Sequence, residues 1–292
     1  MNEQPSAEPL LEDIAAGLPG FYVAGAEYGL QATLRPSSTL FVGFDDISKV
    51  RVRRRIRRGW GYLPARKNGW AYLGVQTYAE NWYRDAEVIA TLERLRDQGF
   101  FSGYERVIFS GVSMGAFAAC AFAPLAPGCI VIAYSPQSTL HPEIAGWDSR
   151  YLQGREQDWT LPYSDAASGI TSARRVWVIS DPHHETDRLH AERLCGKNVI
   201  HLPALHSGHF AMGAIRNGGI LSALTAGCAD LTMSRAEFVR LYKKVRNGRP
   251  YLEQLAKRVI ASPSDCPKHL LHHALLHRKR PWIAGQVAKS FS

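Results

Sequence analysis

Arg106-Val-Ile-Phe-Ser-Gly-Val-Ser-Met-Gly-Ala-Phe-Ala-Ala-Cys-Ala-Phe-Ala123 predicts a strand, a sharp turn and a helix in direct succession. Val107 to Phe109 are β-branched and aromatic, which favours a strand. Residues Ala116 to Ala123 favour a helix. Between them, Gly111-Val-Ser-Met-Gly115 matches the pattern G-x-S-x-G, which holds a serine on a strand-to-helix turn.

The chemistry of such a turn explains its spacing. The serine takes a strained backbone conformation that exposes its hydroxyl, and small residues two positions away on either side leave room for it. Gly111 and Gly115 provide that room. The N-terminus of the following helix favours negative charge, so the Met114 N–H would stabilise an oxyanion beside Ser113. We predict Ser113 as a nucleophile and Met114 as one oxyanion donor; the alternative is a purely structural Gly-Ser turn.

Composition indicates a globular chain. Its 292 residues are 46% hydrophobic and 21% charged, enough for one large domain or a domain with an appendage. No run approaches the roughly 18 apolar residues of a membrane span, and the polar N-terminus is unlike a signal peptide. We expect a soluble cytoplasmic protein without a transmembrane segment. The five cysteines are widely spread, so we expect neither a disulfide framework nor a zinc site, and no cofactor.

The positive charge is concentrated at one end of the chain. From Arg240 onward there are twelve Lys and Arg against Glu253 and Asp265, so this part has a net charge of +10. The rest of the chain has a net charge near −1, which gives the total of +9. We predict a main domain over residues 1–230 and a basic helical extension over 231–292. Such an extension could bind nucleic acid or an anionic membrane. We prefer a packed helical element with a solvated basic face, since no nucleic-acid motif is present. The oligomeric state stays open.

Short apolar runs punctuated by Gly, Pro and Ser predict the remaining strands. The pattern is that of an α/β protein with a doubly wound, mostly parallel sheet. Residues 137–172 show little periodicity between two strands, which is typical of a lid. The strands are expected at 21–24, 30–34, 39–44, 71–77, 107–109 before the turn that carries Ser113, 129–135, 176–180 and 198–203. Helices are expected at 85–98, 188–195 with Thr186 as N-cap, 234–260 and 269–291, with breaks near Gly248–Pro250, Pro263 and Pro267.

The loop after the third strand holds two candidate features. Asp45 or its neighbour would donate the second backbone N–H of an oxyanion hole. Arg51–Arg58 contains six arginines in eight residues, and Trp60 follows. Guanidinium groups bind carboxylates or phosphates and aromatic rings stack on sugars, so Arg54, Arg55 and Trp60 are candidate substrate-binding residues. A solvated basic face is the preferred alternative.

A catalytic serine requires a histidine and an acid from later loops. In a doubly wound hydrolase they follow in the order Ser, acid, His beyond the ends of later strands. We predict His209 as the base, because Ser207-Gly-His-Phe210 forms a turn after the last strand; His206 is the competitor. Asp181 at a strand end is the preferred acid. Asp187 is the alternative, since an acid in the first turn of a helix is also explained by the helix dipole.

Histidines near these aspartates could also be interpreted as metal ligands. His183, His184 and His190 have none of the spacings of known zinc motifs, and adjacent histidines point apart. We therefore expect no metal site.

With these residues in place, the chain resembles the α/β-hydrolase superfamily over residues 20–228. Asn81-Trp-Tyr-Arg84, Ser113-Met-Gly115 and Tyr134-Ser-Pro-Gln137 are similar to a bacterial branch related to proteins encoded with surface-glycan genes. That branch is distantly similar to an accessory secretion protein implicated in glycan acetylation. The chain departs from the superfamily at Phe44-Asp45, where a His-Gly pair is familiar.

The sequence thus predicts a serine esterase that acts on a small-molecule, glycan-linked or anionic ester. An acyltransferase on the same triad is the nearest alternative. A non-catalytic protein that binds an anionic polymer on a hydrolase scaffold is the alternative from a different class, and nucleic acid is not the expected partner.

Overall fold

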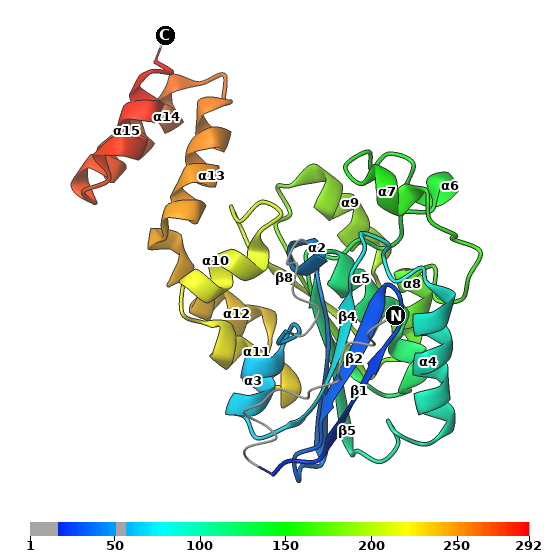
Figure 1. The fold of residues 1–292 in the computed structure, drawn as a ribbon. Coiled ribbons are helices and arrows are strands. Elements are labelled where there is room, and N and C mark those ends of the chain that lie inside the picture. Colours follow the sequence, from blue (N-terminus) through cyan, green and yellow to red (C-terminus); the bar gives the residue numbers. More distant parts are fainter. Residues whose placement is uncertain (1–16, 51–56, 292) are drawn as a thin grey trace, which may run out of the picture.

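A computed structural model describes residues 17–50 and 57–291. It contains one eight-stranded sheet of order β1-β2-β4-β3-β5-β6-β7-β8 (Figure 1). Strands β3 to β8 are parallel, and β2 pairs antiparallel with both β1 and β4. The expected doubly wound, mostly parallel sheet is confirmed. The strands are β1 (Gly20–Ala24), β2 (Tyr28–Thr33), β3 (Thr39–Phe44), β4 (Ala71–Thr77), β5 (Arg106–Val112), β6 (Ile130–Tyr134), β7 (Arg175–Ser180) and β8 (Val199–Pro203).

Helices cover both faces of this sheet, and strands β3 to β8 contribute alternate side chains to the two cores, whereas β1 and β2 contribute to the first core alone. In β5, Val107 and Phe109 join one core, and Ile108 joins the other. The first core contains α4 (Ala86–Asp97), α5 (Met114–Ala121), α8 (Ala166–Gly169) and part of α9 (Glu185–Arg193). The second contains α3 (Tyr62–Lys67), α10 (Ala211–Asn217), α11 (Leu221–Ala229) and α12 (Arg235–Tyr242). A four-residue helix, α2 (Ile47–Val50), follows β3.

The turn between β5 and α5 has the geometry that its sequence predicts. Ser113 has φ 51° and ψ −114°, a conformation that non-glycine residues rarely adopt. A Cβ on Gly115 would lie 2.3 Å from the carbonyl oxygen of Phe44, and one on Gly111 would lie 2.2 Å from the Gly115 carbonyl carbon. Only glycine therefore permits this close approach of α5 to the ends of β3 and β5.

The segment between β6 and β7 is an insertion with three short helices. These are α6 (Pro142–Ala145), α7 (Leu152–Arg155) and α8, followed by the 3-10 helix η2 (Ile170–Ser172). In Figure 1, α6 and α7 lie with α9 at the end of the sheet to which the parallel strands point. The sequence predicted a lid over residues 137–172, and the helices of the insertion, from Pro142 to Ser172, lie within those bounds.

A helical appendage follows the sheet. α12 packs against β8, whereas α13 (Arg249–Ile260), α14 (Asp265–His277) and α15 (Pro281–Ala288) form an arm that projects from the body (Figure 1). The 3-10 helices η1 (Ala123–Leu125) and η3 (Val245–Asn247) follow α5 and α12. The expected break at Pro267 is wrong: Pro267 lies in the first turn of α14, where its missing N–H costs no hydrogen bond. No helix of the described residues is long and apolar enough to cross a membrane.

Candidate active site

Ser113 and His209 meet beyond the carboxyl ends of the strands. The Ser113 Oγ lies 3.0 Å from the His209 Nε2, although the two residues are 96 positions apart. Ser113 belongs to the turn before α5, and His209 to the loop between β8 and α10. Only 7% of Ser113 is exposed. The predicted serine and histidine are therefore within hydrogen-bond distance.

The carboxylate that reaches His209 is that of Asp187. Its Oδ2 lies 2.8 Å and its Oδ1 3.0 Å from the His209 Nδ1. Asp187 is buried in the first turn of α9. Since a carboxylate only accepts, this pair assigns the imidazole proton to Nδ1 and leaves Nε2 to accept the Ser113 hydroxyl proton.

The preference for Asp181 as the partner of His209 is corrected by these contacts. The Asp181 carboxylate is buried and accepts the backbone N–H groups of His183 at 3.0 Å and Gly208 at 2.9 Å. It therefore holds the backbone of the histidine loop instead of the imidazole. Thr186 is likewise not the N-cap of α9: His184 takes that position, and its Nδ1 accepts the Asp187 N–H.

Asp187 is anchored by the insertion as well as by histidines. The Arg150 Nη1 donates to its Oδ1 at 2.8 Å, and the His184 Nδ1 lies 3.4 Å from the same oxygen. Burial alone would raise the pKa of Asp187, but the hydrogen bond from His209 and the electrostatic effect of His184 and His209 hold that pKa well below its usual value. The carboxylate is thus kept ionised and oriented.

Arg150 also ties this carboxylate to a second buried pair. Its Nε and Nη2 donate to the two oxygens of Asp148 at 2.9 and 2.8 Å. Asp148 in turn accepts from the His190 Nε2 at 2.9 Å, and the His190 Nδ1 accepts the Ser138 N–H. Burial lowers the pKa of His190, so this imidazole is neutral. The insertion, α9 and the site form one polar network.

Gln137 places a side-chain amide beside the serine. Its Nε2 lies 3.1 Å from the Ser113 Oγ, and its Oε1 accepts the indole N–H of Trp82 at 3.2 Å. Gln137 and Trp82 are fully buried, so the amide is fixed in direction. Met114 is the first residue of α5, so its N–H has no partner within the helix. These two groups can both donate to an oxyanion next to Ser113.

Asp45 does not supply the oxyanion donor that the sequence predicted. Its backbone N–H donates to the Val75 carbonyl at 3.2 Å, because the pairing of β3 with β4 continues past Phe44. Its carboxylate accepts from the Arg57 Nη2 at 2.6 Å and the Trp60 N–H at 2.8 Å. Burial raises the pKa of Asp45 to about 6 against the opposing effect of Arg57. Asp45 therefore anchors the loop after β3.

Tyr151 covers the histidine from the insertion. Its hydroxyl lies 3.1 Å from the His209 Nε2, and its ring packs on Trp82 with centroids 4.9 Å apart. The Arg150 guanidinium lies over the same ring, 5.0 Å from its centre. A neutral Nε2 has one lone pair, so the hydroxyls of Tyr151 and Ser113 compete for it.

Of the other predicted residues, Trp60 and His206 lie apart from the contacts of Ser113 and His209. Arg54 and Arg55 fall outside the described residues. Trp60 packs its ring against Tyr134, with centroids 6.1 Å apart. His206, the competing base, instead contacts the rings of His183 and Tyr251. Substrate binding by Arg54, Arg55 and Trp60 stays a prediction.

Sequence reasoning missed Gln137, Arg150 and Tyr151 as parts of the site. Gln137 ends the stretch Tyr134–Gln137, and its partner Trp82 lies in Asn81–Arg84, so the motifs that carry the resemblance also build the surroundings of Ser113. Nothing in the local pattern marks Arg150 or Tyr151, because the insertion lacks periodicity.

The sheet order, the serine on its strand-to-helix turn, and the acid and histidine after β7 and β8 define an α/β-hydrolase fold. Neither a protein-family model nor a curated protein matches the sequence. Among solved structures, the capsule O-acetyltransferase of Neisseria meningitidis serogroup A is 15% identical, with a TM-score of 0.44 over 69% of this chain and 92% of that one.

Two further solved structures are similar to this chain. The Pyrococcus furiosus esterase Pf2001 is 13% identical, with a TM-score of 0.47 over 79% of this chain and 99% of that one. The Glycosylation Associate Protein (Gap123) complex from Streptococcus agalactiae is 13% identical, with a TM-score of 0.48 over 73% of this chain and 47% of that one. Identities and TM-scores this low carry no argument about activity.

Acid is expected to destabilise the protein through Asp148 and Asp187. Hydrogen bonds from His190 and Arg150 outweigh burial and hold the pKa of Asp148 below its usual value. The hydrogen bond from His209, with the electrostatic effect of His184, does the same for Asp187. Both contributions to the free energy of unfolding are present above the unfolded pKa of about 3.9 and are lost as pH falls through the lower folded values. Urea unfolding at pH 7, 5, 4 and 3, monitored by circular dichroism, measures the loss.

The Asp148→Asn variant separates this contribution from general acid effects. It should be less stable at pH 7 by about 3 kcal/mol, because Arg150 and His190 lose a buried partner, and its stability should then fall less steeply below about pH 4. Asp97→Asn, at an exposed side chain of α4, is the matched control and should follow the wild type. Parallel curves for the wild type and Asp148→Asn would contradict the assignment.

Proposed function

We propose that this chain is a serine hydrolase that cleaves an ester through an acyl-enzyme on Ser113. His209 acts as general base and acid, and Asp187 orients the imidazole. The observation that carries the proposal is the unbroken chain of contacts from the Ser113 Oγ to the His209 Nε2 at 3.0 Å and from the His209 Nδ1 to Asp187 at 2.8 Å. This arrangement allows a serine hydroxyl to lose its proton at the moment of attack.

In the first half of the reaction, the Ser113 Oγ attacks the ester carbonyl carbon and its proton passes to the His209 Nε2. The resulting imidazolium is stabilised by the Asp187 carboxylate. As the tetrahedral intermediate collapses, the bond from carbon to the alcohol oxygen breaks, and His209 returns the proton to that oxygen. In the second half, water attacks the acyl carbonyl carbon while His209 takes a proton from the water. The bond from that carbon to the Ser113 Oγ then breaks, and His209 returns the proton to Oγ.

The negative charge on the carbonyl oxygen needs donors in place before the reaction. The Met114 N–H and the Gln137 Nε2 are the proposed donors, since both lie next to Ser113 and Gln137 is fixed by Trp82. The hydroxyl of Tyr151 becomes a third donor once His209 carries the proton from Ser113, because Nε2 then no longer accepts. Two of the three proposed donors thus belong to side chains.

An alcohol in place of water would turn the same residues into an acyltransferase. The position of the Tyr151 hydroxyl, 3.1 Å from the His209 Nε2, is where an acceptor hydroxyl would have to lie to give up its proton. A small-molecule or glycan-linked ester is the proposed substrate class. The ratio of hydrolysis to transfer onto added glycerol, measured with an activated acetyl ester, distinguishes the two activities.

Replacing the two aspartates tests the proposed acid. Asp187→Asn should lower kcat for 4-nitrophenyl acetate by about 10³- to 10⁴-fold, because an amide favours the wrong imidazole tautomer. Asp181→Asn is the comparison: its amide keeps an acceptor for only one of the backbone N–H groups of His183 and Gly208, which use different oxygens, but it should lower kcat less than Asp187→Asn does, because Asp181 does not contact the imidazole. A larger loss for Asp181→Asn would identify Asp181 as the acid.

Gln137→Glu tests the side-chain donor at nearly constant shape. A carboxylate repels an adjacent oxyanion, so kcat should fall by about 10²- to 10³-fold with a smaller change in KM. Gln153→Glu introduces the same charge on the exposed face of α7 and should leave kcat within about twofold. An unchanged kcat for Gln137→Glu would remove Gln137 from the oxyanion hole.

A further inference from the structure

A second histidine, His184, lies beside the carboxylate that orients His209. Its Nδ1 is 3.4 Å from the Asp187 Oδ1 and accepts the Asp187 N–H at 3.3 Å. The His209 Nδ1 lies within 3.0 Å of both oxygens of the same carboxylate. The two imidazole rings are 6.0 Å apart. Two histidines therefore face Asp187 through their Nδ1 atoms.

The buried charges around Asp187 leave one negative charge without a fixed partner. Asp148 and Asp187 carry one negative charge each, and Arg150 bridges them with its Nη2 and Nη1, both at 2.8 Å. His190 adds no charge, because burial lowers its pKa. Two carboxylates and one guanidinium have a net charge of −1. That charge can stabilise one imidazolium, whereas a second would leave an excess positive charge in a region of low dielectric.

His184 is placed to take up a proton from solvent. Its side chain is 31% exposed, although Asp187 is buried. Once protonated, its Nδ1 would donate to the Asp187 Oδ1. This hydrogen bond is the main reason why the pKa of His184 lies above its usual value, and burial opposes it. A protonated Nδ1 can no longer accept the Asp187 N–H, so neutral His184 caps α9 and charged His184 binds the carboxylate instead.

Charged groups face His184 from each neighbouring element. Asp187 of α9 and Asp181 of the loop after β7 favour its protonated form. Arg150 of the insertion opposes that form. An imidazolium at His209 would oppose it too, because its ring lies 6.0 Å away. The protonation of one histidine is therefore expected to disfavour that of the other.

We propose that His184 and His209 share the charge of Asp187, and that protonation of His184 withholds this charge from the His209 imidazolium. The inference rests on the proposed function, in which His209 becomes an imidazolium when Ser113 attacks. With His184 neutral, the carboxylate stabilises that imidazolium alone. With His184 protonated, the transition state has to carry a second positive charge beside the same carboxylate. His184 is thus a positioning residue, which acts through Asp187.

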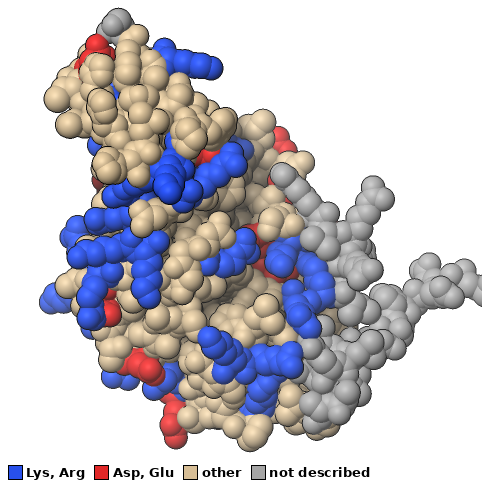
Figure 2. Space-filling model, turned by 90° about the vertical axis from the view of Figure 1, so that its left-hand side faces the viewer, with Lys and Arg blue, Asp and Glu red and all other residues tan. Residues whose placement is uncertain are grey.

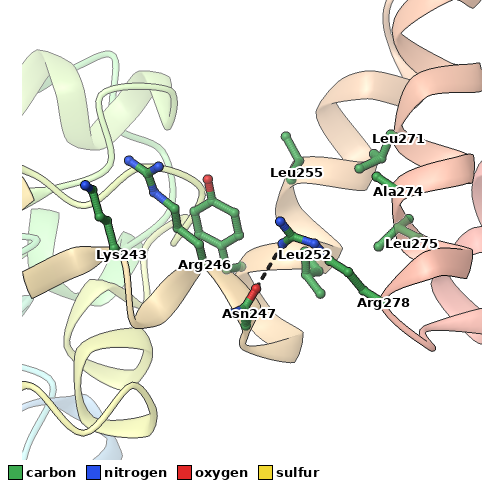
Figure 3. A pocket seen from close by; sticks show the side chains of 10 residues that line it. Lys243, Arg246, Asn247, Leu252, Leu255, Leu271, Ala274, Leu275 and Arg278 are labelled. Carbon is green, nitrogen blue, oxygen red and sulfur yellow. Dashed lines mark hydrogen bonds between the residues drawn. The ribbon is translucent and has the colours of Figure 1, made fainter. Parts of the chain in front are cut away.

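The adjacent His183 provides a matched control, because its ring has other contacts. It packs against His206 with centroids 5.3 Å apart, and His206 packs against Tyr251 of α13. This side of the loop adjoins the basic arm. Figure 2 shows Lys and Arg side chains gathered where the arm meets the body, and Figure 3 shows Arg246 at the hollow that Tyr251 lines. Burial lowers the pKa of His206, and Arg246 adds to this effect, so the cations of the arm act on this pair.

The pH dependence of kcat/KM for 4-nitrophenyl acetate tests the proposal. The variant His184→Asn cannot take up a proton, and its Oδ1 can still accept the Asp187 N–H and cap α9. The wild-type value should fall on the acid side once either imidazole is protonated. In His184→Asn only His209 titrates, so the midpoint of that fall should move to lower pH by at least about 0.3 unit, the shift for two equally basic groups.

His183→Asn should keep the wild-type midpoint. For His184→Asn, an unchanged midpoint or one at higher pH would overturn the proposal. An equal shift in His183→Asn would overturn it as well, because any change in the loop would then have the same effect.

Proton uptake can also be followed without catalysis, in the full-length Ser113→Ala variant. Proton NMR of the imidazole Hε1 signals should show two-step titration of both His184 and His209, because each proton changes the charge available to the other. Adding His184→Asn should reduce the His209 curve to one step. Independent one-step titrations in Ser113→Ala would overturn the shared charge. Coupled titrations in a protein whose wild type lacks esterase activity would support the shared charge and remove the proposed function.

Discussion

The backbone of Ser113 is the constraint on which the rest of the site depends. A positive φ for a residue with a Cβ is unfavourable, and here it persists because Gly111 and Gly115 allow β3, β5 and α5 to approach closely. The turn directs the hydroxyl away from the sheet at the edge where all parallel strands end. Loops after β7 and β8 emerge at that edge, so an acid and a histidine reach the serine without any further adjustment of the sheet.

The insertion does more than cover the site. Arg150 binds Asp187 and Asp148, and Tyr151 lies between Trp82 and His209. Gln137, the first residue after the turn at the end of β6, is held by the same Trp82. The carboxylate, the imidazole and the amide beside Ser113 are therefore all positioned by residues of the insertion or by partners they share. A displacement of the insertion would disturb the orientation of His209 and the donors at Ser113 together.

The sequence could predict the sheet, the turn and the Ser113–His209 pair because each has a local signal. Strands carry runs of β-branched and apolar residues, and the turn carries two glycines at fixed spacing. The choice between Asp181 and Asp187 has no such signal: one follows a strand and the other begins a helix, and both lie near the histidine loop. Only the path of α9, which begins at Glu185 with His184 as its cap, directs Asp187 toward the imidazole.

The sequence predicted Asp45 or its neighbour as an oxyanion donor, and the N–H of Asp45 is engaged elsewhere for a related reason. Asp45 follows the third strand as the prediction required, but strand pairing continues for one residue and uses its N–H. The amide of Gln137 reaches Ser113 through a bend after β6, where Ser135 also has a positive φ. Such contacts between distant segments depend on tertiary packing and leave no periodic pattern in the chain.

Labelling with a fluorophosphonate tests whether Ser113 is an activated nucleophile, because the reagent forms a stable bond only with an activated serine. After trypsin digestion and mass spectrometry, we expect the added mass on the peptide that begins at Val107, at Ser113. The label should be absent from Ser113→Ala and from a folded His209→Ala variant. A folded wild-type protein that stays unlabelled, or a Ser113→Ala variant labelled as strongly as the wild type, would contradict the account.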